Sequence, residues 1–124
     1  MQADLNPTDK NTPTKRQRFA QVALQKIVQR KTMGNFSDYI TFAKKFPALI
    51  HACGLVQAIA FAQVKLPEIV EDLAEVMRSA GNLLGEEDLA IMSREANIGK
   101  YQRLSRDALD AASWLKRYTE AHSQ

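Results

Sequence analysis

Residues 47–64 have the sequence PALIHACGLVQAIAFAQV, in which apolar side chains occupy every face of a helix. A helix that is apolar all round is either the central helix of a bundle or a membrane span. A span needs about 20 such residues, whereas this stretch includes His51, Gln57 and Gln63. Because one-sided helices flank it, we expect a central core helix that begins at Pro47, a residue suited to a first helical turn.

Amphipathic segments lie on both sides of this stretch, with apolar residues at intervals of three and four. We expect Gly34 to end the first helix as a C-cap and Pro67 to open the fourth. The predicted helices cover Thr14 or Lys15 to about Lys31, Ser37 or Asp38 to Phe46, 47–64, 67–83, a short segment that begins at 86–88, and a last helix from Lys100 or Ser105.

The composition agrees with an all-α fold. The chain of 124 residues has only 5 Gly and 4 Pro, and this length suits one domain. We predict a single compact bundle of about six helices around the central apolar helix, over residues 14–124. Residues 1–13 are polar and include Pro7 and Pro13, so we predict a flexible tail there.

Catalytic and metal-binding residue types are scarce. One Cys and two His cannot build a closed zinc site, and no glycine-rich phosphate loop occurs. His51 and Cys53 are two positions apart, so on a helix they point in nearly opposite directions. We expect Cys53 to be a core thiol, and a lone thiol without a signal peptide favours a cytoplasmic protein. We expect no enzyme activity, no cofactor and no metal.

Acidic residues cluster on the predicted fourth helix, opposite its apolar stripe, which favours a solvated outer face. A magnesium role would need help from substrate phosphates. These residues are Glu68, Glu71, Asp72 and Glu75.

Basic side chains gather near the N-terminus. Residues 10–45 contain nine Lys and Arg against one acid, whereas residues 66–124 contain 7 basic and 11 acidic side chains. Lys and Arg neutralise phosphates without recognising sequence, so this segment is either a solvated face or a polyanion-binding face. Aromatic residues nearby are few, and no base-stacking platform is evident. The candidates are Arg16, Arg18, Lys26, Arg30, Lys31, Lys44 and Lys45.

A second feature is the segment Trp114–Arg117 on the last helix. Trp114 could seal the core edge while Lys116 and Arg117 interact with the negative end of the helix dipole. An interface role for the same residues stays open.

Several of these motifs occur together in one known family. The segments Pro47–Ile50, Gly54–Leu55, Gln57–Ala58 and Ala60–Phe61 resemble the central-helix motif of the small all-helical subunit of the Cmr complex, the fifth subunit of the type III-B CRISPR effector. The likeness covers about residues 16–121. Its other elements are Tyr39, Lys44–Lys45, Tyr101, Leu104–Ser105, Asp107–Leu109 and Trp114–Arg117.

The resemblance implies a non-catalytic subunit that stacks along the backbone of the complex and helps hold target RNA paired to guide RNA, in antiviral defence. The implied partners are other Cmr subunits, the two RNAs and further copies of the chain, which meet head to tail through basic and acidic surfaces. A stand-alone helical nucleic-acid-binding or adaptor protein is the alternative. The candidate subunit-interface residues are Glu68, Glu71, Asp72, Glu75, Lys116 and Arg117.

Overall fold

The computed structural model describes residues 12–123, and these residues form an all-helical bundle. The helices are α1 (Lys15–Lys31), α2 (Phe36–Cys53), α3 (Leu55–Lys65), α4 (Pro67–Ser79), α5 (Leu89–Glu95) and α6 (Ile98–His122). The all-α class and the number of about six helices are therefore confirmed. Residues 1–11 of the predicted tail lie outside the described part of the chain.

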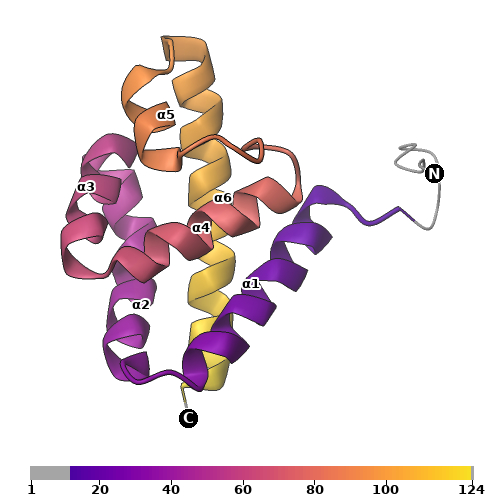
Figure 1. Ribbon diagram of the computed structural model, residues 1–124, viewed down its shortest axis with the longest axis vertical. Coiled ribbons are helices and arrows are strands. Elements are labelled where there is room, and N and C mark those ends of the chain that lie inside the picture. The colour runs from indigo at the N-terminus through magenta and orange to yellow at the C-terminus, as the bar shows by residue number, and fades with distance from the viewer. Residues whose placement is uncertain (1–11, 124) are drawn as a thin grey trace.

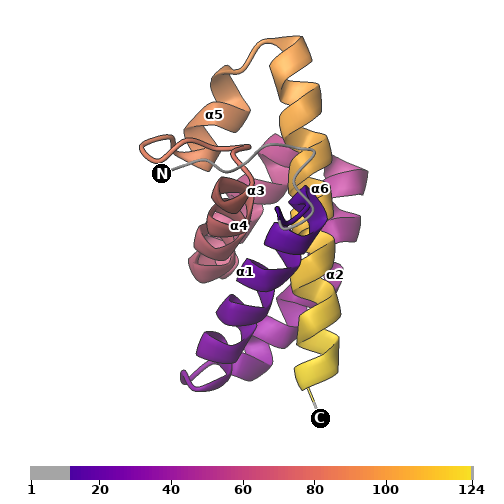
Figure 2. The same ribbon diagram turned by 90° about the vertical axis from the view of Figure 1, so that its right-hand side faces the viewer.

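The longest helix, α6, organises the bundle. It has 25 residues and runs the full height of the molecule in Figure 1. Helices α1 and α2 pack along it, and α4 crosses the bundle in contact with α1, α3 and α6. The short helix α5 packs at one end, against the first turns of α6 (Figure 2). The long helix at the C-terminus, rather than residues 47–64, therefore spans the whole fold.

The predicted helix boundary at Pro47 is wrong. Helix α2 continues through Pro47, and the chain turns instead at Gly54, where φ is 84°. A proline inside a helix removes one hydrogen bond and crowds the preceding turn, a cost that the packing of α2 against α6 and α3 outweighs here. The chain turns at Gly54 because glycine adopts a positive φ at no steric cost. The Tyr101 hydroxyl accepts a hydrogen bond from the amide of Val56 (3.3 Å), which satisfies one free donor of the first turn of α3.

The expectation of a central core helix over residues 47–64 is also wrong. In α3 the buried side chains lie on one side only: Leu55, Ala58, Ile59 and Ala62. On the other side Phe61 is 42% exposed and Val64 is 81% exposed, and the thiol of Cys53 is exposed as well. The apolar stretch is divided between two helices that pack on each other and leave an apolar outer surface.

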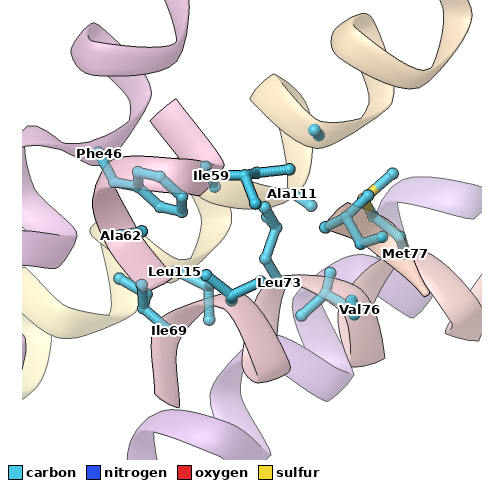
Figure 3. Packing of buried hydrophobic residues seen from close by; sticks show 14 of the residues in the cluster. Phe46, Ile59, Ala62, Ile69, Leu73, Val76, Met77, Ala111 and Leu115 are labelled. Atoms are coloured by element: carbon cyan, nitrogen blue, oxygen red, sulfur yellow. The ribbon is translucent and has the colours of Figure 1, made fainter. Parts of the chain in front are cut away.

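The core lies where α2, α3, α4 and α6 meet. Figure 3 shows side chains from all four helices converging there, and α4 supplies a continuous inner row. Helix α1 covers this core with Phe19, Ala23 and Ile27, whereas Leu24 and Val28 on the same helix are exposed. The labelled core residues are Phe46, Ile59, Ala62, Ile69, Leu73, Val76, Met77, Ala111 and Leu115.

Several other helix ends follow local capping chemistry. Thr14 is the N-cap of α1 and forms a capping box with Gln17, and the helix begins at Lys15, within the predicted start of Thr14 or Lys15. The C-cap of α1 is Thr32 rather than Gly34, and α4 begins at Pro67 as predicted. Helix α6 begins after the N-cap Asn97, earlier than either predicted start.

The exposed thiol gives a direct test of this arrangement. Cys53 is the sole cysteine of the chain, and because it is exposed we expect the native protein to react with a chromogenic disulfide reagent about as fast as the urea-unfolded protein does. A reaction that waits for urea would place Cys53 in the core, as the sequence suggested. The variant Cys53→Ser supplies the blank.

Candidate nucleic-acid interface

One basic candidate, Arg30, points inward and binds a buried carboxylate. Its guanidinium donates two hydrogen bonds to the carboxylate of Asp72, from Nε (2.9 Å) and from Nη2 (3.0 Å). The Tyr39 hydroxyl donates a third to the same carboxylate, at 2.6 Å. Asp72 is completely buried. Because Arg30, Tyr39 and Asp72 belong to α1, α2 and α4, this network joins three helices.

The network also fixes the charges of its members. The hydrogen bond to Asp72 raises the pKa of Arg30, so the guanidinium stays charged. Burial raises the pKa of Tyr39, and the negative charge of Asp72 raises it further, so the phenol stays a donor. Two donors therefore face one carboxylate, and all three groups are satisfied.

Two predicted site residues are corrected by this geometry. Asp72 does not belong to a solvated acidic face, because it points inward at Arg30 and Tyr39. Arg30 differs from a surface arginine, because its side chain is only 15% exposed and its guanidinium is paired with Asp72. Asp72 is therefore not available to a partner, and the Nε and Nη2 groups of Arg30 are already used within the fold.

The remaining acids of α4 differ in exposure. Glu71 and Glu75 are exposed, and Glu75 pairs with Arg78 at 3.4 Å. Glu68 is partly buried and accepts a hydrogen bond from the Asn35 side chain at 3.0 Å. Hydrogen bonds from its own backbone amide and from Asn35 lower the pKa of Glu68. An acidic surface thus exists on α4, but it is centred on Glu71 and Glu75.

The basic candidates of α1 do not form one continuous face. The outer surface of the helix carries exposed glutamines together with Leu24 and Val28. Arg18 is partly buried and its Nε lies 3.5 Å from the carbonyl of Pro13. Lys26 borders a hollow of about 460 Å³ that it shares with Glu71, Glu75 and Asp88, among others. Arg16 and Lys31 are exposed near the two ends of the helix.

Lys44 and Lys45 are the best-placed adjacent pair among the basic candidates. Both are exposed on α2, away from the core. The ammonium of Lys45 lies 5.5 Å from the centre of the Phe42 ring, which in turn stacks on Phe61 of α3 at 5.9 Å. Neither lysine has an ion-pair partner within the described residues. Two positive charges without an ion-pair partner in residues 12–123 therefore occupy consecutive positions of this helix.

At the C-terminal half of α6, the structure brings together residues that the sequence only hinted at. Trp114 packs against the core edge, and the exposed Arg117 guanidinium lies 4.8 Å from the centre of its ring. Tyr118 stacks on the same indole at 5.9 Å. Arg16 of α1 lines a small hollow with Trp114 and Arg117. The sequence signal for this cluster was the spacing of residues 114, 117 and 118, but the contribution of Arg16 could not be inferred.

Residues 12–123 show no cluster of potential metal ligands. No group of three His, Cys, Asp or Glu side chains there could hold a metal ion. In the same range no helix is long and apolar enough to cross a membrane.

These features define a class of protein: a small all-helical bundle that contains an internal ionic network and carries unpaired basic groups at its surface. The model of the CRISPR-associated protein family Cas_Cmr5 matches residues 15–122, and the chain belongs to this family. The match confirms the resemblance inferred from the central and C-terminal motifs.

Two relatives support the assignment. The chain is 32% identical over 108 residues to the CRISPR system Cmr subunit Cmr5 of Thermus thermophilus, a match that covers 87% of this chain and 95% of that protein. It is also similar to the crystal structure of a CRISPR-associated Cmr5 family protein from the same organism, with a TM-score of 0.78 and 33% identity. That match covers 88% of this chain and 97% of the other.

Proposed function

We propose that the chain is a non-catalytic structural subunit of a type III-B Cmr ribonucleoprotein in the cytoplasm, where it helps to hold target RNA against guide RNA in antiviral defence. Membership of the Cmr5 family and the name of the Thermus relative support the assembly. The exposed, unpaired Lys44 and Lys45 on α2 are the observation that carries the RNA contact.

The charges of these lysines suit a backbone contact rather than sequence recognition. Lys contacts to phosphate position a nucleic acid and carry no base information. Binding by one copy is weak, since a single subunit offers a handful of such contacts, but copies in a row along one strand add multivalently. Guide pairing would then supply the specificity.

Self-stacking is the second part of the proposal. Lys44 and Lys45 lie on α2, whereas the exposed acids Glu71 and Glu75 lie on α4. Two unlike surfaces on one chain allow a heterologous contact between successive copies, and such a contact propagates as a filament. Lys116 and Arg117 on α6 remain candidates for contacts with other subunits. With Asp72 buried, the acidic side of the contact rests on Glu71 and Glu75, with Glu68 at its partly buried edge.

The test of the RNA contact is a charge reversal at the paired lysines. Lys44→Glu with Lys45→Glu should leave folding intact, because exposed substitutions usually change stability by about 0.5 kcal/mol or less. The variant should weaken capture of target RNA by the reconstituted complex and flatten its salt dependence, by about 0.7 in log–log slope for each lost phosphate contact. Which target sequence is captured should not change.

A matched control separates this effect from net charge. Arg94→Glu with Arg103→Glu reverses two exposed charges on α5 and α6 and changes the net charge by the same amount. We expect this control to bind target RNA as tightly as the wild type. Equal binding and equal salt slopes for the wild type and both variants would show that Lys44 and Lys45 are only solvated, and the RNA contact would be rejected.

A further inference from the structure

The hollow between α1 and α6 combines an aromatic surface with two arginines. It measures about 290 Å³ and is lined by Arg16 of α1 and by Asp110, Ser113, Trp114 and Arg117 of α6. The indole of Trp114 is partly exposed. Tyr118 stacks on it with the two rings 23° from parallel, so the ring is held in a fixed orientation.

Neither arginine of the hollow is neutralised by an ion pair within the described part of the chain. Within residues 12–123, neither Arg16 nor Arg117 has a carboxylate within ion-pair distance, whereas Arg30, Arg78 and Lys15 are all paired. The Arg117 guanidinium rests 4.8 Å from the indole centre, and a guanidinium held against a ring keeps N–H donors available at its edge. The hollow therefore offers fixed donors beside an aromatic ring.

We propose that this hollow binds one nucleotide step of single-stranded RNA, with a base against the part of the Trp114 ring that Arg117 and Tyr118 leave exposed and the flanking phosphates on Arg16 and Arg117. The inference rests on the proposed RNA-holding function and assigns it a second contact point, separate from Lys44 and Lys45. Aromatic rings beside basic groups are the recurring arrangement of proteins that bind single strands.

The other residues of the hollow fit a base better than a phosphate at its centre. Asp110 repels a phosphate, but a carboxylate accepts a hydrogen bond from the amino group of a base such as cytosine. The Ser113 hydroxyl donates to the carbonyl of Leu109 at 2.9 Å and can still accept a bond from a base. The phosphates are thus placed at the rim, where Arg16 and Arg117 are exposed.

An acidic peptide is the competing occupant, since two arginines would also bind carboxylates. The aromatic pair favours RNA, because stacking uses the face of the indole and a carboxylate does not. The apolar hollow between α2 and α3, lined by Leu49, Cys53, Gln57, Ala60 and Phe61, contains no arginine and lacks this combination.

The test uses Trp114 as its own reporter, because it is the sole tryptophan of the chain. The full-length protein is titrated with a 12-nucleotide single-stranded RNA, with the same backbone made abasic, and with a polyglutamate peptide. We expect RNA to quench the indole fluorescence saturably, and the abasic strand to bind by anisotropy with little quenching. Equal quenching by the abasic strand, or quenching by polyglutamate alone, would overturn the proposal, and the latter result would assign the hollow to a protein partner.

Substitutions separate the ring from the charges. Trp114→Leu should weaken binding of the RNA about tenfold, the effect of losing one stacked base, whereas Trp114→Phe should retain most of the affinity. Arg16→Gln with Arg117→Gln should lower the salt slope by about 1.4, for two phosphate contacts at about 0.7 each. Circular dichroism melting checks that Trp114→Leu is folded. If Trp114→Leu is not folded, the RNA affinity of Trp114→Phe is the measurement used instead.

The outcomes also separate this proposal from the general function. If RNA leaves the indole fluorescence unchanged while Lys44→Glu with Lys45→Glu still impairs capture by the complex, the hollow is not a base site and the RNA-holding function stands. If Trp114 is quenched by bases but the lysine variant captures RNA normally, the hollow is the contact and the lysine surface is rejected.

Discussion

Asp72→Asn should destabilise the protein by about 3–5 kcal/mol, the range found when one partner of a buried ion pair is removed. The substitution keeps the size of the side chain but removes its charge, so the Arg30 guanidinium faces a neutral amide inside the fold and keeps only the exposed carboxylate of Glu71 nearby. Arg30 cannot neutralise itself, because its pKa lies far above neutral and is raised further in the native fold. The free energy of unfolding, measured with urea, gives the result.

Neighbouring substitutions define the origin of this loss. Glu71→Gln changes the adjacent exposed acid, 3.6 Å from Arg30, and should cost about 0–1 kcal/mol, as exposed pairs do. Tyr39→Phe should cost about 1–3 kcal/mol, since it removes one donor from a buried carboxylate. The double variant Arg30→Met with Asp72→Leu should be more stable than Asp72→Asn, because it leaves no buried charge without a partner. Wild-type stability of Asp72→Asn would mean that the network does not hold the three helices together.

Much of the helical framework could be predicted from local signals. The capping chemistry of Thr14 and the position of Pro67 are readable from a few adjacent residues, and both predictions were confirmed. Pro47 misled the prediction because a proline is well suited to a first helical turn. Inside a helix it is tolerated only with tertiary support, which the sequence does not show. The decisive residue is Gly54, whose positive φ is a property of the folded backbone and not of its sequence neighbours.

The fate of Asp72 shows the limit of helical periodicity. Its neighbours at 68, 71 and 75 are acidic, so the pattern suggests one solvated face, yet position 72 also borders the inner face next to Ile69 and Leu73. Its burial is made favourable by Arg30, which is 42 positions away in the sequence. A pairing between distant helices leaves no local signal.

The candidate site was predictable in its charge but not in its shape. The basic excess identified Lys44 and Lys45, which the structure places on an exposed surface. It also selected Arg30, which the structure pairs with Asp72, and it treated Arg16 and Trp114 as unrelated. Helix α1 packs alongside α6, and only that packing brings Arg16 to the indole.

Leu55→Ala should destabilise the protein by about 2–5 kcal/mol, while Phe61→Ala should have a clearly smaller effect. The sequence suggested equal burial for both, because both lie in the same apolar stretch. In the fold Leu55 is fully buried at the start of α3, whereas Phe61 is 42% exposed. Truncating a buried leucine removes its transfer free energy and leaves a cavity, whereas a partly exposed ring loses only the part of its surface that was out of water.

The comparison is made on three variants by urea denaturation at one temperature. Val64→Ala is the matched control, because Val64 lies on the same helix, is 81% exposed, and should change stability by about 0.5 kcal/mol or less. The expected order of destabilisation is Leu55→Ala, then Phe61→Ala, then Val64→Ala. The order follows from Gly54, which turns α3 so that one side of the apolar stretch packs on α2 and α4 and the other faces outward. A loss at Phe61 as large as that at Leu55 would mean that the outer surface of α3 is covered in solution, which contradicts the exposed face described above.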